Sequence, residues 1–286
     1  MNTSIIHDTY LPFSKSDLAP HFRDEKHLDQ LIDSCLRHTT FMHRYKDLPI
    51  AMSVSSEVKR ERQIEKDERA WTVKSLKTAF EKRSLPKVLE EAFSFNTEHA
   101  SEIDWESLVG DPGDLELYFE VGLSSPQAYR AALRSRYENA AKELDLLPYL
   151  QEAATGRSQL EGATRVDAVI VNRVTKFAIL FEAKYLSDTS PYVTFDPIRN
   201  QLARNIDVLL SDDSDLLPVP LDRRYFCLLT PEVFRQKPRS RHYGMLLHEY
   251  RNHPETLCED LPHQLRDKVS AASKRIGWAT YEGCLR

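Results

Sequence analysis

Two acidic side chains and a lysine are notable because they interrupt otherwise apolar segments of the chain. Asp167 lies inside the run RVDAVIV, and Glu182 and Lys184 end the run FAILFEAK. Two carboxylates and a backbone carbonyl, here that of Ala183, are hard oxygen ligands of the kind that Mg²⁺ accepts. A lysine beside such a site can orient or deprotonate an attacking water, or stabilise charge on a pentavalent phosphate. These residue types predict metal-assisted hydrolysis of a phosphodiester, with Mg²⁺ or Mn²⁺ bound by Asp167, Glu182 and the Ala183 carbonyl.

Both runs have the composition of β-strands, and the sequence predicts a hairpin that positions the three side chains. Residues 165–171 and 176–185 are rich in β-branched and aromatic residues, and a short polar connection separates them. Because side chains alternate along a strand, Glu182 and Lys184 point to the same side, and the hairpin brings Asp167 across from Glu182. Burying three such groups without compensation would cost several kcal/mol each, which a bound dication would offset.

The Glu-x-Lys triplet is weak evidence when taken alone. A chain of this length contains about one such triplet by chance. The triplet at Glu57 is an example, because it lies inside a mixed-charge segment. The triplet at Glu182 differs, since it follows an apolar strand whose partner strand carries an acidic residue. The strand context therefore selects the second triplet as the candidate site.

The remaining pattern predicts an α/β fold with a mixed central sheet flanked by helices. Strand-like segments are expected at 115–121 and 224–230. A Ser-Pro pair is typical of a helix start and predicts a helix over 125–147, and a second helix is expected at 198–210. The order helix, strand, strand, helix, strand is that of an α/β sandwich.

The N-terminal third has a different texture from the rest of the chain. Residues 1–105 are predicted to form a helical region, and residues 106–286 the sheet-containing domain. Apolar residues recur at three- and four-residue spacing from Leu28 to Leu36, and no strand pattern competes there. The mixed-charge run at 57–69 is predicted to be a solvated helix. The N-terminal helices are the expected surface for a protein partner or for a second copy of the chain in a homodimer.

Val166-Asp167 followed by Glu182-x-Lys184 resembles the signature of the PD-(D/E)XK nuclease superfamily, which has the restriction-endonuclease-like fold. The resemblance covers about residues 125–230. It implies an αβββαβ core and a Mg²⁺-dependent nuclease in which Asp167 and Glu182 bind the metal and Lys184 assists the water.

The same resemblance implies roles for two helices. The helix that follows the hairpin resembles one that carries a Gln or Arg near the active site in several branches, which implies that Gln201 or Arg204 assists at the phosphate. Asn205 shares their helical face, because it lies four residues after Gln201. In some branches a Glu on the preceding helix contacts the metal, and Glu138 is the best match, followed by Glu143.

A polyanionic substrate requires a local cationic surface, because the whole chain is acidic. The chain has 39 Lys and Arg against 44 Asp and Glu, a net charge of -5, which excludes a global positive field. Four cations near Tyr243, a residue available for stacking, are predicted to contact nucleic acid: Arg235, Lys237, Arg239 and Arg241. DNA is favoured over RNA.

Several classes of protein are excluded by what this chain of 286 residues lacks. No run approaches the roughly 18 to 20 apolar residues of a membrane span, and the first ten residues lack the order of a signal peptide. The 4 cysteines include no C-x-x-C pair, which predicts free thiols in a reducing compartment. With only 8 glycines, the chain has neither a phosphate-binding loop motif nor a G-x-S-x-G nucleophile motif. We therefore expect a soluble cytoplasmic protein with no membrane partner.

Two other functions fit the same sequence. A catalytically inactive module of restriction-endonuclease-like fold would bind nucleic acid or a protein partner without cleaving anything. A helical interaction protein would depend mainly on residues 1–105. Metal binding that is lost in Glu182→Gln favours the nuclease, whereas partner binding by the N-terminal region alone favours the interaction protein.

Overall fold

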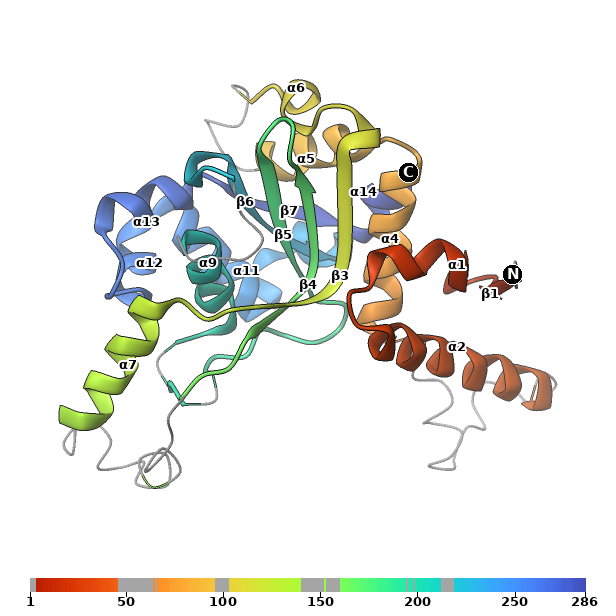
Figure 1. Ribbon diagram of the computed structural model, residues 1–286, viewed down its shortest axis with the longest axis horizontal. Helices are drawn as coiled ribbons and strands as arrows, with labels where there is room; N and C mark the ends of the chain where they lie inside the picture. The colour runs from red at the N-terminus through yellow and green to blue at the C-terminus, as the bar shows by residue number, and fades with distance from the viewer. Residues whose placement is uncertain are drawn as a thin grey trace.

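A mixed sheet of five strands forms the centre of the described part of the chain (Figure 1). The computed structural model describes residues 4–45, 64, 66–95, 103–139, 152, 160–193, 195–197, 199–211 and 219–286. In both chain order and spatial order, the strands are β3 (Leu115–Leu123), β4 (Thr164–Asn172), β5 (Phe177–Ala183), β6 (Arg224–Thr230) and β7 (Ile276–Thr280). Strands β3, β4 and β5 are antiparallel to one another in turn, whereas β5, β6 and β7 run parallel. The predicted α/β class, with a mixed central sheet flanked by helices, is confirmed.

The predicted hairpin is present as β4 and β5, and its turn is held by a buried asparagine. The Asn172 side chain donates to the Val109 carbonyl at 2.8 Å and accepts from the backbone N–H groups of Val174 and Thr175 at 2.8 and 3.0 Å. All seven residues of β5 are buried, as expected for a central strand covered on both faces. Strand β6 has the predicted bounds, and β3 runs two residues beyond the predicted segment.

Helices cover both faces of the sheet. One face is covered by α4 (Glu68–Glu81), α5 (Leu85–Ser94) and α14 (Tyr281–Leu285). The opposite face is covered by α9 (Gln201–Leu210), α11 (His242–Asn252), α12 (Pro254–Asp260) and α13 (Arg266–Ser273). Two short helices, α6 (Trp105–Val109) and α10 (Glu232–Gln236), lie in connections.

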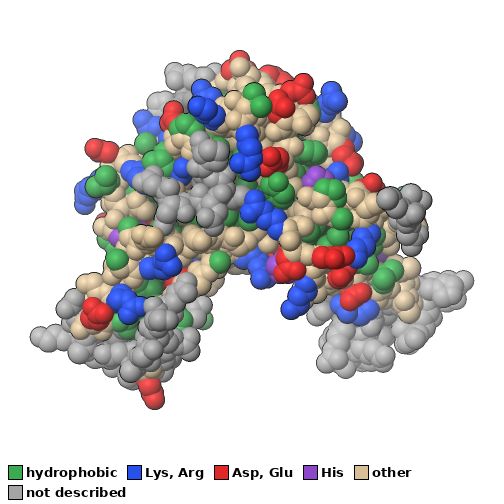
Figure 2. Space-filling view, viewed as in Figure 1, with side chains coloured by type: hydrophobic (Ala, Val, Ile, Leu, Met, Phe, Trp, Pro, Cys, Tyr) green, Lys and Arg blue, Asp and Glu red, His purple; other side chains and the backbone are tan. Residues whose placement is uncertain are grey.

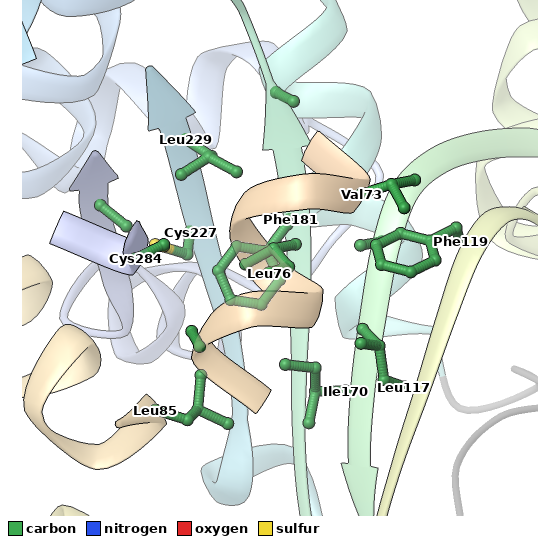
Figure 3. Packing of buried hydrophobic residues seen from close by; sticks show 14 of the residues in the cluster. Val73, Leu76, Leu85, Leu117, Phe119, Ile170, Phe181, Cys227, Leu229 and Cys284 are labelled. Atoms are coloured by element: carbon green, nitrogen blue, oxygen red, sulfur yellow. The ribbon is translucent and has the colours of Figure 1, made fainter. Parts of the chain in front are cut away.

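The core under α4 joins the N-terminal region to the sheet. Figure 3 shows Leu76 of α4 against Phe181 of β5, and Val73 of α4 near Phe119 of β3. All four side chains are at most 2% exposed. The core therefore crosses the boundary expected near residue 105, and α4 and α5 form a covering layer of the sheet.

The N-terminal segment contains a hairpin that the sequence pattern does not predict. Strands β1 (Ile5–His7) and β2 (Leu11–Ser14) pair antiparallel, ahead of α1 (Lys15–Leu18) and α2 (Glu25–Tyr45). The described residues of this region are otherwise mainly helical, and strands of three and four residues are too short to produce a recognisable alternation in the sequence. Most of the mixed-charge run at 57–69 lies outside the described residues. Its last residues are described, and there α4 begins at Glu68, directly after the N-cap Asp67.

The two helices predicted around the hairpin are present in the described residues. The helix expected over 125–147 is described as α7 (Gln127–Asn139), and residues 140–147 lie outside the described part. The helix expected at 198–210 begins as α9 at Gln201, because the Asn200 side chain caps it by accepting from the Ala203 N–H at 3.0 Å.

The C-terminal end of β5 faces a hollow in the surface of the protein. The β4–β5 turn lies beside α6 at the top of Figure 1, so β5 ends at the lower edge of the sheet. Figure 2 shows that this edge lies above a hollow between the two projections that α2 and α7 form. Charged side chains of both signs lie along the upper border of that hollow.

Gly277→Ala is expected to lower the free energy of unfolding by about 1–3 kcal/mol. A Cβ at Gly277 would lie 2.5 Å from Cε2 of Phe93, and that ring is held by Trp105 and Tyr225 at centroid distances of 4.7 and 5.5 Å. Gly162→Ala is the matched control, because its Cβ meets nothing within 4 Å. Urea unfolding checks the pair, and equal stabilities of the two variants would contradict this account of the packing.

Candidate active site

The structure brings Asp167 and Glu182 to neighbouring strands, as the sequence predicts. Strand β4 pairs with β5 so that Ala168 lies opposite Phe181, and the next positions toward the end of β5 are Asp167 and Glu182. Oδ2 of Asp167 accepts a hydrogen bond from the backbone N–H of Ala183 at 2.7 Å. This bond ties the carboxylate of β4 to the end of β5.

Glu182 and Lys184 form a buried ion pair. Nζ of Lys184 donates to Oε1 of Glu182 at 2.5 Å and to the Ala183 carbonyl at 3.0 Å. The other carboxylate oxygen of Glu182 accepts from the Asn205 side chain on α9. Glu182 is 1% exposed and Lys184 is 5% exposed. Both charges are thus held in a fixed arrangement at the end of β5.

A third carboxylate, which sequence reasoning missed, comes from the first turn of α4. Oε1 of Glu68 lies 3.6 Å from Nζ of Lys184. Its Oε2 accepts from the Tyr185 N–H at 2.7 Å and from the Ser187 hydroxyl at 2.8 Å. The Glu68 side chain is 27% exposed, so it links the buried pair to solvent. In the sequence, Glu68 is one acid among many in the run expected to be a solvated helix, and no local pattern separates it from the others.

Glu138, the acid favoured on the helix before the hairpin, does not join this cluster in the described structure. Glu138 is exposed on α7, a helix that projects away from the sheet in Figure 1. Among the described residues, Glu138 has no hydrogen bond or ion pair with Asp167, Glu182 or Lys184. Glu143 lies outside the described residues. Among the described residues, the helix acid beside Lys184 is instead Glu68. Glu68 belongs to residues 1–105, which the sequence pattern separates from the sheet-containing domain.

Of the three polar residues predicted to share a face of α9, the structure brings Asn205 into the cluster. Gln201 instead accepts from the Ser190 N–H at 3.4 Å. Nε of Arg204 lies 2.5 Å from Oε1 of Glu161, a buried acid. In the described structure, Gln201 and Arg204 therefore contact Ser190 and Glu161.

The predicted nucleic-acid tract is divided between buried and exposed cations. Arg235 is 6% exposed and pairs with Glu91 and Glu232, so it serves the packing of α10. Lys237 and Arg239 are exposed. Arg241 is partly exposed, and its guanidinium stacks 4.4 Å from the centre of the Phe234 ring. Tyr243, which was expected to be available for stacking, is completely buried, because α11 packs it against Trp278 at a centroid distance of 6.0 Å.

Strained backbone lies beside Asp167. The β3–β4 register pairs Phe119 with Ala168 and Val121 with Val166, so Glu120 is opposite Asp167. Glu120 has a φ of 52°, in the left-handed region that non-glycine residues rarely adopt. A crevice at this point is lined by Asp167, Glu120, Arg69, His27 and Thr72, among others, and gives Asp167 a route to the surface.

Two acids of the cluster, Asp167 and Glu182, are held where ionisation is unfavourable. Burial, together with repulsion from Glu182, raises the pKa of Asp167 well above its usual value. Burial also raises the pKa of Glu182, although Lys184 and Asn205 oppose the shift. For Lys184, burial acts against the charge, but the carboxylates of Glu182, Glu68 and Asp167 prevail and raise its pKa. The cluster thus holds three carboxyl groups around a single ammonium group.

Two carboxylates and a carbonyl in this cluster fit a hard dication. Oδ1 of Asp167 has no hydrogen bond among the described residues, Oδ2 is bonded to the Ala183 N–H, and Glu182 is close enough to raise the pKa of Asp167 by repulsion. A divalent ion would relieve the repulsion that raises the pKa of Asp167. In the described ranges, no group of three or more His, Cys, Asp or Glu side chains is placed to hold a metal ion, and Mg²⁺ is an ion that takes few protein ligands and keeps several waters. The Lys184 ammonium already contacts two of these oxygens and would have to share them.

Asp167→Asn is expected to be more stable than the wild type at about pH 8, and to lose that advantage toward about pH 4. A carboxyl group whose folded pKa is raised contributes stability below its unfolded value of about 3.9, and this contribution is lost as pH rises through the folded value. Urea unfolding in EDTA at several pH values checks the trend. The exposed Asp222→Asn serves as the control, and a stability difference for Asp167→Asn that does not change with pH would contradict the prediction.

Comparisons with protein-family models, curated proteins and solved structures gave no match for this chain. Among the described residues, no helix is long and apolar enough to cross a membrane. The cluster formed by Glu68, Asp167, Glu182 and Lys184 is therefore the feature from which a function can be inferred.

Proposed function

We propose that this chain is a metal-dependent nuclease that hydrolyses phosphodiester bonds, with DNA as its substrate. The observation that carries the proposal is the cluster at the end of β5, where the Lys184 ammonium contacts Glu182 and Glu68 and where Asp167 is tied to Ala183. Phosphoryl transfer requires cations that neutralise the negative charge of the phosphate. The Lys184 ammonium is one such cation, and carboxylates that repel one another could bind a metal ion as a second.

The order of elements along the chain supports a restriction-endonuclease-like fold. The chain runs α4, β3, β4, β5, α9, β6, with α5, α6 and α7 in the connections. This is the αβββαβ order that the resemblance implies, provided that α4 is its first helix. Glu68 then comes from that first helix, and the candidate ligands come from the second and third strands.

Asp167, Glu182 and the Ala183 carbonyl would hold Mg²⁺ or Mn²⁺. Bound there, the ion would neutralise the paired carboxylates and polarise a phosphate oxygen. Lys184 keeps its proton near neutral pH because the surrounding acids raise its pKa, so it acts as a cation at the phosphate rather than as a base. Glu68 is a part-exposed carboxylate beside Lys184, and we assign it the role of accepting a proton from water.

The hollow between α2 and α7 is the proposed approach route for nucleic acid. The cluster lies at the lower edge of the sheet in Figure 1, and Figure 2 shows that edge above the hollow. The exposed Lys237 and Arg239 remain proposed phosphate contacts. Arg235 is no longer proposed, because it is engaged in ion pairs with Glu91 and Glu232. A protein partner or a second copy on the N-terminal helices also remains a proposal, in which the exposed Leu36 of α2 would contribute.

One observation favours a binding module without catalysis. Glu182 and Lys184 are almost completely buried and neutralise each other in the described structure. Such a pair also occurs as a purely structural feature of folded proteins. Under this alternative, the same fold would bind nucleic acid or a protein partner, and no metal would be needed.

Incubation with plasmid, linear duplex DNA, single-stranded DNA and RNA distinguishes the two proposals. Each substrate is tested with Mg²⁺, with Mn²⁺ and with EDTA. The nuclease proposal predicts metal-dependent cleavage of DNA that EDTA abolishes. Absence of cleavage of every substrate at saturating metal would overturn it and favour the binding module. A preparation of Glu182→Gln, purified in the same way, controls for contaminating nucleases.

A further inference from the structure

A pocket of about 500 Å³ lies away from the carboxylate cluster, between α11, β7 and the end of α5. Its apolar walls include Phe95, Trp278, Leu247 and Met245. The Phe95 and Trp278 rings meet edge to face, with centroids 6.0 Å apart and planes at 78°. Small-molecule sites have volumes of about 300–1,000 Å³ and mostly apolar linings, so the pocket has the size and character of one.

Cations converge on the same pocket. Arg239 and Arg251 line it, together with His248 and one acid, Glu249. Arg251 is partly buried, and its hydrogen bond in the described structure is a long one of 3.5 Å to the Phe93 carbonyl. Among the described residues, no carboxylate forms an ion pair with Arg251. Burial lowers the pKa of Arg251 to about 10, which leaves it charged at neutral pH. A partly buried cation without a counter-ion is unfavourable, and an anionic ligand would offset that cost.

The rim of the pocket depends on a close approach between two segments. A Cβ at Gly244 would lie 2.1 Å from the Pro238 carbonyl oxygen, so only glycine lets α11 approach the segment that carries Arg239. The register of β5, β6 and β7 aligns Glu182, Leu228 and Trp278. The pocket therefore lies two strands from Glu182, and no residue of the carboxylate cluster lines it.

We propose that this pocket binds a nucleoside monophosphate, with the base against the partly exposed Phe95 ring, which Trp278 supports from within the core, and the phosphate on Arg251 and Arg239. Aromatic side chains stack on any base, and the guanidinium fork donates two bonds to a phosphate. The ligand is either a free nucleotide or one nucleotide of a single strand, since both present the same chemistry. The proposal goes beyond the hydrolytic function and does not depend on it, because binding at this pocket needs no metal.

Calorimetric titration in EDTA tests the proposal with four probes: adenosine monophosphate, adenosine, inorganic phosphate and a short single-stranded oligonucleotide. We expect saturable binding of the monophosphate or the oligonucleotide that is tighter than that of adenosine and of phosphate. Binding of the oligonucleotide alone identifies the strand as the source of the ligand. Saturable binding of neither, or phosphate binding as tight as that of both nucleotide probes, overturns the proposal.

Two variants connect this binding to the pocket. Arg251→Met removes the cation but keeps the volume, and Met245→Glu adds a negative charge at a side chain that is 53% exposed, so its fold is expected to persist. Each is expected to weaken nucleotide binding by about tenfold or more, the value of a charge-assisted hydrogen bond to phosphate. The matched control is Leu265→Glu, at a 76% exposed position outside the pocket, which is expected to bind as the wild type does. Wild-type affinity in both pocket variants overturns the assignment.

Discussion

Glu182→Gln is expected to lower metal-dependent cleavage by about 10³-fold, because a metal contributes several kcal/mol of transition-state stabilisation and that energy corresponds to such a factor. The substitution keeps the size of the side chain and its contact with Asn205, but removes the negative charge beside Asp167. Single-turnover cleavage at saturating metal measures the effect, and thermal melting verifies that the variant is folded. Cleavage within a few-fold of the wild type would contradict the role of Glu182.

Glu68 and Glu138 provide a matched comparison for the same activity. Glu68 lies 3.6 Å from the Lys184 ammonium, whereas Glu138 is exposed on α7. Glu68→Gln is expected to lower cleavage by about 10²-fold, at the lower end of the contribution of a positioned proton acceptor. Glu138→Gln is expected to leave cleavage unchanged. If Glu138→Gln lowers cleavage and Glu68→Gln does not, Glu138, the residue that the sequence favours, belongs to the site and Glu68 does not.

Asp207→Asn is expected to lower the free energy of unfolding by about 3–5 kcal/mol, the largest stability effect that we predict. Asp207 is completely buried on α9, and its Oδ2 accepts from Arg199 at 2.7 Å. Its Oδ1 lies 2.9 Å from Nε2 of His263 and accepts from Gln264 at 2.8 Å. Arg199 is 1% exposed and stacks 3.5 Å from the centre of the Tyr129 ring. The neutral amide would leave this buried guanidinium with less compensation for its charge.

Urea unfolding measures this effect, and Asp222→Asn is the matched control because Asp222 is exposed. The control is expected to change stability by less than about 0.5 kcal/mol. A loss below about 1 kcal/mol in Asp207→Asn would mean that water or neighbouring groups satisfy Arg199 without the carboxylate.

Strands β3 to β6 of the sheet and two acids of the candidate site were predictable from local sequence. Strands β4, β5 and β6 are apolar, β-branched and aromatic over seven to nine residues, so composition alone identifies them. The antiparallel pairing follows from the short connection between β4 and β5, and it fixes the relation between Asp167 and Glu182. The functional roles of these residues stay predictions.

The contribution of Glu68 was not predictable, because it depends on a contact between residues 117 positions apart. The hydrogen bond from the Tyr185 N–H to Glu68 joins the first turn of α4 to the segment after β5. The charges around Glu68 do not predict that contact, because acids and bases are mixed throughout the run. The ion pair between Arg204 and Glu161 was missed for the same reason, because it joins α9 to a loop 43 residues earlier.

The burial of Tyr243 also has a long-range cause. A tyrosine next to a basic tract has the composition of a stacking surface, but α11 turns this ring inward against Trp278 of β7. Local sequence does not specify which side of a short helix faces a sheet when polar and apolar residues are mixed along it. In the pocket beside α11, the aromatic lining residues are Phe95 and Trp278.

Calorimetric titration of the metal-free protein with Mn²⁺ tests the central claim most directly, namely that the acids at the end of β5 hold a dication. We predict saturable binding to the wild type and to Glu138→Gln, and loss of that binding in Asp167→Asn and in Glu182→Gln. Binding of the same affinity in all four proteins, or no binding to the wild type at millimolar Mn²⁺, would contradict the account and leave the cluster as a structural ion pair.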